Sequence, residues 1–119
     1  RGYKMVTTDE REDKLFHCPA LTTIKLISGK WKTRILWLLR ERAHSFNELR
    51  RTLPGVSGIV LAEQIAQLED AGLVCKRKVE RDGLTYSDIA YTTYGLSLLP
   101  VLDGLGEWGL KHRRSENQR

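Results

Sequence analysis

The segment from residue 45 to residue 73 constrains the fold most, because it encodes two short helices joined by a tight turn. Residues 45–48, Ser-Phe-Asn-Glu, match a capping box, in which the serine hydroxyl accepts from the backbone N–H of the glutamate and the glutamate carboxylate accepts from that of the serine. Pro54-Gly55 ends the first helix, Ser57 caps the second, and Gly72 is the expected left-handed residue that stops it. Apolar residues repeat at helical spacing in both helices, so each needs a partner surface.

Two further helices precede this pair. Proline suits the first helical position, so the first helix should begin at Cys18-Pro19, with the cysteine at or next to the N-cap, and Gly29 should end it. The second is expected over residues 30–42, with an apolar face made by Trp31, Ile35, Leu38 and Leu39. The helices over 45–53 and 57–72 can bury their apolar faces together only against this second helix.

A hairpin and a last helix follow. Residues 74–80 and 85–91 are β-capable, and Asp82-Gly83 between them is a typical hairpin turn. A helix should then begin near Thr92-Thr93, and Pro100 within it should kink or split it. The order of elements therefore predicts a mainly α protein with a small β-hairpin, in the winged helix-turn-helix arrangement.

The length of 119 residues fits one domain. We expect a flexible N-terminal arm over residues 1–14, the winged helix-turn-helix domain over 15–110 and a polar tail over 111–119. No uncharged apolar run approaches the roughly 18 residues of a membrane span, and the N-terminus does not read as a secretory signal. Two cysteines are too few for a disulfide scaffold, so the cytoplasm is the expected compartment. The histidines are scattered, and we expect neither a metal nor another cofactor.

The net charge of +5, with a pI of about 9.4, is a weak indication of a polyanionic partner, but its distribution says more. Residues 30–51 hold seven basic residues against two acidic ones, and residues 76–81 hold four against one. Residues 57–72, between these blocks, hold three acidic residues and no Lys or Arg. Charge runs are commonly only solvated faces, but in this architecture the two blocks flank the helix expected to read DNA.

Taken in order, these pieces are similar to those of HxlR-type transcriptional regulators, winged-helix proteins like those of the MarR group. The matching residues lie between about 15 and 110 and are Cys18-Pro19, residues 29–32, Ile35-Leu36, residues 46–51 and 53–57, Leu61, residues 68–74, Thr92, Gly95, residues 100–102 and Trp108-Gly109. The resemblance implies a homodimer on an inverted-repeat operator in double-stranded DNA, with the N- and C-terminal helices forming the interface. It also implies a small electrophile or oxidant as an effector, which several members sense through a cysteine matching Cys18.

The helix over residues 57–72 is expected to enter the major groove with its N-terminal turn. If Leu61, Ile65 and Leu68 face inward, the residues near the helix start or on its outer face are Ser57, Gly58, Ile59, Glu63 and Gln67. The serine can donate to a phosphate or a base edge, the glycine permits close approach, the isoleucine can contact a thymine methyl, and the glutamate can accept from a cytosine amino group. For Glu63 and Gln67, a plain solvated face is an equal alternative. Members of the family often carry Lys or Arg near this start, so the bases read here stay open.

Positive charge for the phosphates must therefore come from outside this helix. The candidates are Lys30, Lys32, Arg50, Arg51, Lys76, Arg77, Lys78 and Arg81. We expect about four to six phosphate contacts per monomer. Strand alternation turns Arg77 away from its neighbours, so the wing residues do not all face DNA, and insertion of a wing arginine into the minor groove is an alternative. The prolines usual near the wing tip of the family are absent here.

Cys18 is the sensor candidate, because a helix N-terminus stabilises the reactive thiolate. The alternative is that it is a small apolar residue filling a helix junction, and the two interpretations stand about even. Cys75 lacks such a setting and is interpreted as packing, with a Cys18–Cys75 bridge left open.

The last helix carries an apolar stripe that a chain of this size cannot bury alone, which independently favours a dimer. Its expected interface residues are Leu98, Leu102, Leu105 and Trp108, whereas Trp31 is expected in the core.

The leading hypothesis is thus a dimeric DNA-binding regulator of transcription, and not an enzyme. The alternative is a protein-interaction module that uses the same fold without specific DNA binding, favoured by the acidic helix. A thiol enzyme based on Cys18 ranks last, because no base or resolving partner other than His17 is evident.

Overall fold

The capped helical pair lies where the sequence places it. In the computed structural model, which describes residues 18–118, it consists of α4 (Phe46–Thr52) and α5 (Gly58–Asp70). The Glu48 N–H donates to the Ser45 hydroxyl at 3.1 Å, and the Ser45 N–H donates to the Glu48 carboxylate at 3.0 Å. The Val60 N–H donates to the Ser57 hydroxyl, also at 3.1 Å. Both predicted caps are confirmed.

The core forms around α3 (Lys32–Leu39), which follows α2 (Pro19–Ile27). Leu61, Ile65 and Leu68 form the buried face of α5, as predicted. The helix α3 is shorter than the expected 30–42, and its fully buried residues include Leu36, which the predicted face omitted. The reason is that α3 is covered on two sides, since it contacts β3 as well as α5.

The predicted hairpin is formed by β2 (Val74–Arg81) and β3 (Leu84–Tyr91), which pair antiparallel in regular register. Asp82 and Gly83 connect them with φ of +53° and +76°, the two positive values of the expected tight turn. A third strand, β1 (His44–Ser45), pairs with the other edge of β3, so the order in the sheet is β1-β3-β2. Two residues are too few for a strand pattern, which explains why the sequence did not predict β1.

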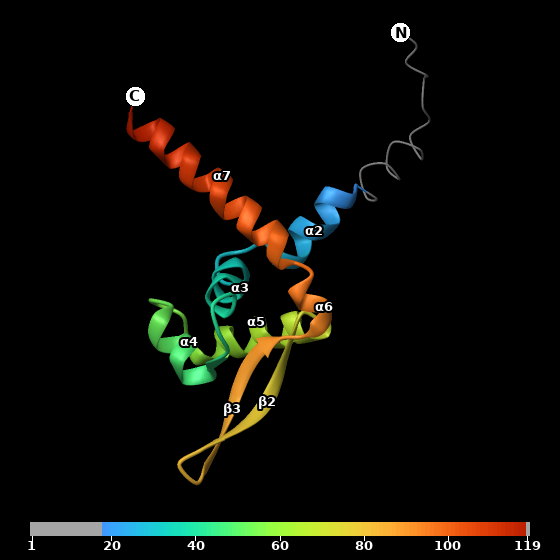
Figure 1. Ribbon diagram of the computed structural model, residues 1–119, viewed down its shortest axis with the longest axis vertical. Coiled ribbons are helices and arrows are strands. Elements are labelled where there is room, and N and C mark those ends of the chain that lie inside the picture. The colour runs from blue at the N-terminus through green and yellow to red at the C-terminus, as the bar shows by residue number, and fades with distance from the viewer. Residues whose placement is uncertain (1–17, 119) are drawn as a thin grey trace.

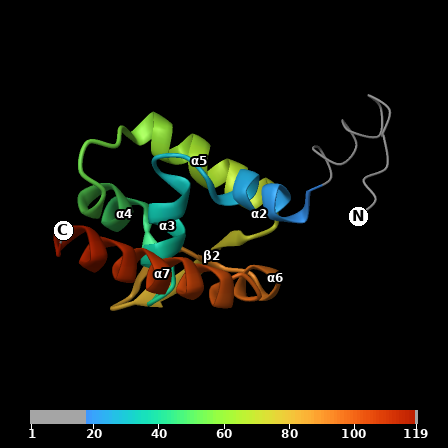
Figure 2. The same ribbon diagram turned by 90° about the horizontal axis from the view of Figure 1, so that it is seen from above.

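The last helix is split, as Pro100 predicted, into α6 (Thr93–Leu96) and α7 (Leu99–Asn117). The proline occupies the first turn of α7, where its missing N–H removes no helical bond. The helix α7 continues through three glycines and through residues 111–117, the segment that the sequence separated as a polar tail. It extends along the side of the molecule away from the wing tip (Figure 1), and the view from above shows it beside α3 (Figure 2). The expected arm over residues 1–14 lies outside the described residues.

Candidate nucleic-acid interface

The outer face of α5 is accessible, whereas its inner face is sealed in the core. Ile59 is 75% exposed although it is apolar, and Ser57, Glu63 and Gln67 are exposed as well. The predicted recognition residues therefore lie on the side of the helix that a ligand can reach.

Arg50, near the end of α4, supplies positive charge at the start of α5. A Cβ built on Gly58 would lie only 3.4 Å from the Arg50 Nη1 atom, so the guanidinium rests against the first turn of α5. Glycine leaves room for this approach. The helix α5 has no basic residues of its own, and the Arg50 guanidinium of α4 supplies positive charge at its start. Sequence spacing alone did not reveal this contact.

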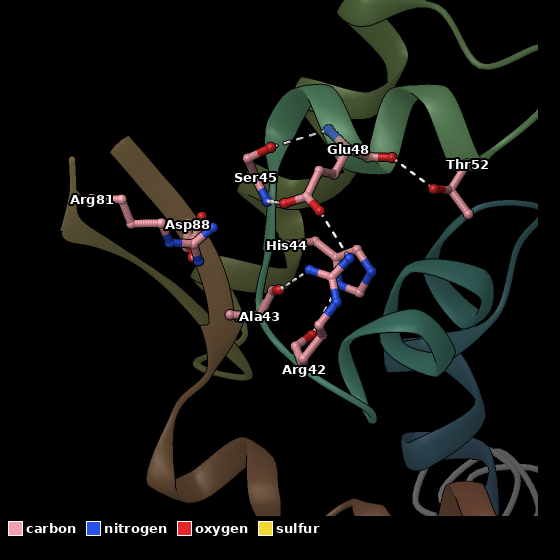
Figure 3. Close-up of polar contacts among 8 residues, drawn as sticks. All are labelled: Arg42, Ala43, His44, Ser45, Glu48, Thr52, Arg81 and Asp88. Carbon is pink, nitrogen blue, oxygen red and sulfur yellow. Dashed lines mark hydrogen bonds and ion pairs between the residues drawn. The ribbon is translucent and has the colours of Figure 1, made fainter. Parts of the chain in front are cut away.

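The wing arginines and lysines fall into two groups. Lys76 pairs with Glu69 of α5 at 3.9 Å. Arg81 pairs with Asp88 at 3.4 Å (Figure 3). Arg77 and Lys78 are exposed and have no ion pair among the described residues. Regular strand geometry over β2 places Arg77 on the face opposite Lys76, as alternation predicted.

The other basic residues that the sequence predicted as phosphate contacts do not all lie on one surface. Arg51 is exposed on α4 next to Arg50. Lys30 is in the loop between α2 and α3, which lies toward α7, whereas the wing projects from the opposite side (Figure 1). The Lys30 ammonium lies 4.9 Å from the Trp31 ring centroid, and Lys32 begins α3. The structure therefore separates Lys30 and Lys32 from the surface shared by α5 and the wing.

Two separate groups of polar contacts lie near the junction between the wing and α4 (Figure 3). Arg42 donates to the Glu48 carboxylate at 2.8 Å, and the His44 ring lies 2.9 Å from the Arg42 carbonyl oxygen. The Ser45 N–H and the Arg42 guanidinium lower the pKa of Glu48 from 4.5 to about 2. Asp88 is only 4% exposed, and its carboxylate pairs with the Arg81 guanidinium across the hairpin. Sequence reasoning predicted the contact between Ser45 and Glu48. It missed the contacts of Arg42 and His44, which depend on how the chain folds before α4, and the Arg81–Asp88 pair, which depends on the register of the hairpin.

Cys18 occupies the N-cap of α2, as predicted, and its carbonyl oxygen accepts from the Thr22 N–H at 3.1 Å. Its side chain makes no capping hydrogen bond and is half-buried. Both Cys18 and Cys75 are free thiols, so no bridge joins them here. Cys75 is half-buried in β2 opposite Ala90. Among the described residues, no cluster of His, Cys, Asp or Glu is suited to hold a metal ion.

The predicted interface on α7 needs one correction. Leu105 and Trp108 are 53% and 68% exposed, but Leu102 is only 1% exposed and packs in the core of its own domain. The exposed positions repeat at helical spacing as Val101, Leu105 and Trp108, with Leu98 half-buried before them. The Trp108 ring stacks on His112, with centroids 5.2 Å apart. Leu102 lies one position further around the helix and faces α3.

A groove of about 780 Å³ separates α7 from α3 and the end of α4. Its lining is mainly apolar and is made by Trp37, Leu38, Leu53, Leu102, Leu105 and Leu110, among others. Trp31 does not line the groove and is partly buried against the core, as expected.

None of the helices within residues 18–118 is long and apolar enough to cross a membrane. The capped helical pair, the hairpin beside it and the accessible face of α5 define a winged helix-turn-helix protein. A protein of the MarR family from Porphyromonas gingivalis W83 shows the same fold, with a TM-score of 0.67 at 23% identity, covering 91% of this chain and 97% of that one.

Comparison with known families narrows this class. A model described as HxlR-like helix-turn-helix matches residues 26–117, and the chain belongs to this family of transcriptional regulators. An HTH-type transcriptional regulator of Methanothermobacter thermautotrophicus is 31% identical over 108 residues, which cover 91% of this chain and 82% of the relative. The solved structure of the redox regulator HypR in its reduced form has a TM-score of 0.75 at 27% identity and covers 85% of this chain and 99% of that one.

Proposed function

We propose that the protein binds double-stranded DNA as a homodimer at an inverted-repeat operator, with α5 in the major groove. The observation that carries this proposal is the accessible face of α5, on which an exposed Ile59 lies close to a helix start that Arg50 approaches. In this geometry Ile59 contacts a thymine methyl, and the Ser57 hydroxyl, which already accepts from Val60, donates to a phosphate or a base edge.

The phosphate contacts come from residues around α5 rather than from α5 itself. Arg50, Arg51, Arg77 and Lys78 are exposed and carry no ion pair among the described residues. Arg50 and Arg51 can therefore bind phosphates without breaking an internal contact, together with either Arg77 or Lys78, which point to opposite faces of β2. Lys76 and Arg81 must first exchange a carboxylate for a phosphate, which reduces their net contribution. Glu63 and Gln67 are exposed on α5, and in this proposal they contact bases, with cytosine as the partner that suits the glutamate.

Dimerisation through α7 accounts for the exposed apolar stripe. Val101, Leu105 and Trp108 repeat along one side of the helix, and burying them against a second copy removes their apolar surface from water. A symmetric dimer then presents two copies of α5, as an inverted repeat requires.

Cys18 is the proposed point of effector input. At the N-cap of α2 its thiol makes no capping hydrogen bond and is only half-buried, so a small electrophile or oxidant can reach it. The structural relative HypR is named as a redox regulator, which supports this assignment. Oxidant or quinone should weaken DNA binding by the wild type but not by Cys18→Ser, and equal responses of the two proteins would remove Cys18 from the mechanism.

The decisive experiment is a gel-shift titration of the protein against the promoter beside its own gene, with random DNA of equal length as the competitor. We expect a preference of at least a thousandfold for the specific site. Absence of a shift, or a shift without preference at moderate salt, would favour the alternative, an interaction module that binds another protein through the acidic side of α5.

A further inference from the structure

One glycine of α7 lies directly against a side chain of α3. A Cβ built on Gly106 would lie 2.3 Å from Cη2 and 2.8 Å from Cζ3 of the Trp37 indole on α3. Gly104 and Gly109 of the same helix have nothing within 4 Å of such an atom. The indole of Trp37 therefore occupies the space that a side chain at position 106 would need, and the two helices approach closely at this point.

A second contact lies beside the first. The Arg40 Nε atom is 3.2 Å from the Asp103 carboxylate, and the Arg40 guanidinium lies 4.0 Å from the centroid of the Trp37 ring. Trp37 and Arg40 are three residues apart on α3, and Asp103 and Gly106 are three residues apart on α7, so each pair shares one helix face. Two contacts about one turn apart fix the angle between the helices as well as their separation.

From this geometry we propose that Trp37 and Gly106 determine the spacing between the two DNA half-sites that the protein accepts. The inference rests on the proposed function, because it takes α7 as the dimer helix and α5 as the recognition helix. In the proposed dimer, α7 lies between the partner subunit and α3, and α3 packs against α5. A change of angle at the Trp37–Gly106 contact is therefore transmitted to the distance between the two recognition helices.

The length of α7 amplifies a change at this contact. The 19 residues of α7 span about 28 Å at 1.5 Å per residue. A tilt at the Trp37–Gly106 contact therefore moves the far end of the helix further than the contact itself moves, and the two recognition helices must keep both their distance and their rotation about the DNA axis to fit both half-sites. A single methyl group at position 106 should thus weaken binding at the wild-type spacing more than at neighbouring spacings.

The test compares Gly106→Ala with the matched control Gly104→Ala. Both substitutions give α7 the same gain in helix propensity, but only the first places a methyl group against the indole. The wild-type protein first selects binding sites from a random duplex library. All proteins are then titrated with the selected half-sites at spacings varied one base pair at a time, after sedimentation has established folding and dimer formation.

We expect Gly104→Ala to keep the wild-type spacing profile and Gly106→Ala to change it, with about tenfold weaker binding at the original spacing. The double variant Trp37→Leu/Gly106→Ala, in which a smaller side chain makes room for the methyl, should return to the original spacing. If Gly106→Ala does not fold, Trp37→Leu alone should broaden the range of accepted spacings, and a wild-type range would overturn the proposal.

The failures are distinguishable. Identical spacing profiles for folded Gly106→Ala and Gly104→Ala overturn the role of the Trp37–Gly106 contact and leave the proposed function intact. A wild-type protein that enriches no sequence from the library overturns the proposed function, and the spacing role with it.

Discussion

The faces presented by α5 and α7 both expose large apolar side chains, but in different surroundings. On α5, Ile59 is the exposed large apolar residue, and polar side chains and the Arg50 guanidinium surround it. On α7, Val101, Leu105 and Trp108 follow one another along a single side. An isolated apolar contact within a polar, basic surface suits a DNA groove, whereas a continuous apolar stripe suits another protein surface.

The largest effect on the free energy of unfolding is expected at Gly95, where α6 contacts the residue Leu73 that follows α5. A Cβ on Gly95 of α6 would lie 2.0 Å from the Leu73 carbonyl oxygen, which accepts from the Thr92 N–H at 3.1 Å. Because backbone cannot yield as a side-chain tip can, Gly95→Ala should reduce the free energy of unfolding by about 3 kcal/mol. Urea denaturation measures this, with Gly104→Ala as the control. A Gly95→Ala variant as stable as that control would show that the regions of α5 and α7 adjust their positions independently of each other.

Substitutions of Trp108 on α7 and of Ile59 on α5 should have different effects on dimer formation. Replacing it with alanine is expected to weaken the dimer by about 2 kcal/mol, because a large aromatic side chain loses its buried contact. Sedimentation equilibrium measures the dimer constant. The matched control is Ile59→Ala, which removes an equally exposed apolar side chain from α5 and should leave the dimer unchanged while weakening binding at one thymine position. Equal effects of both substitutions on dimerisation would remove the distinction between the faces.

Replacing Arg50 tests whether positive charge distinguishes the face of α5 from the face of α7. Its replacement by alanine should weaken DNA binding by about 1.5 kcal/mol, similarly across operator sequences, because one phosphate contact is lost. The slope of log K against log salt should fall in magnitude by about 0.9. Arg114→Ala, which removes an exposed arginine from α7, serves as the control and should change neither quantity. A loss confined to one operator sequence would instead assign Arg50 to base reading.

The sequence predicted the elements that depend on local chemistry and missed contacts between distant ones. The caps at Ser45 and Ser57, the turn at Asp82-Gly83 and the split at Pro100 follow from neighbouring residues, and each is present. The approach of Arg50 to the start of α5 follows from how the helices pack, which no local pattern encodes.

The same limit explains the correction on α7. Leucines at positions 98, 102 and 105 share a helical face by spacing, so the sequence assigned Leu102 to the dimer interface with its neighbours. The structure rotates α7 so that Leu102 enters the core, where it is 1% exposed, while Leu105 stays 53% exposed. Periodicity identifies an apolar face, but the angle at which the helix docks decides which of its residues remain on the surface.

The smallest expected effect lies at the cap of α4, beside the recognition helix. In the folded protein the pKa of Glu48 is about 2, against an ordinary value of 4.5, because the Ser45 N–H and Arg42 stabilise its charged form. A lowered folded-state pKa adds stability that is complete above about pH 4.5 and is lost as the pH falls toward about 2. Glu48→Gln should therefore be less stable than the wild type by about 1 kcal/mol at pH 7, the usual worth of a cap.

This difference should narrow through the same acidic range, since the wild-type carboxylate then becomes neutral like the glutamine. Urea denaturation at pH 7, 4 and 3 follows it, with Glu63→Gln on the exposed face of α5 as the control. Glu63 makes no hydrogen bond or ion pair with the rest of the described chain, so its replacement should change the free energy of unfolding by less than about 0.5 kcal/mol. A difference for Glu48→Gln that stays constant with pH would mean that the cap acts through its shape rather than its charge.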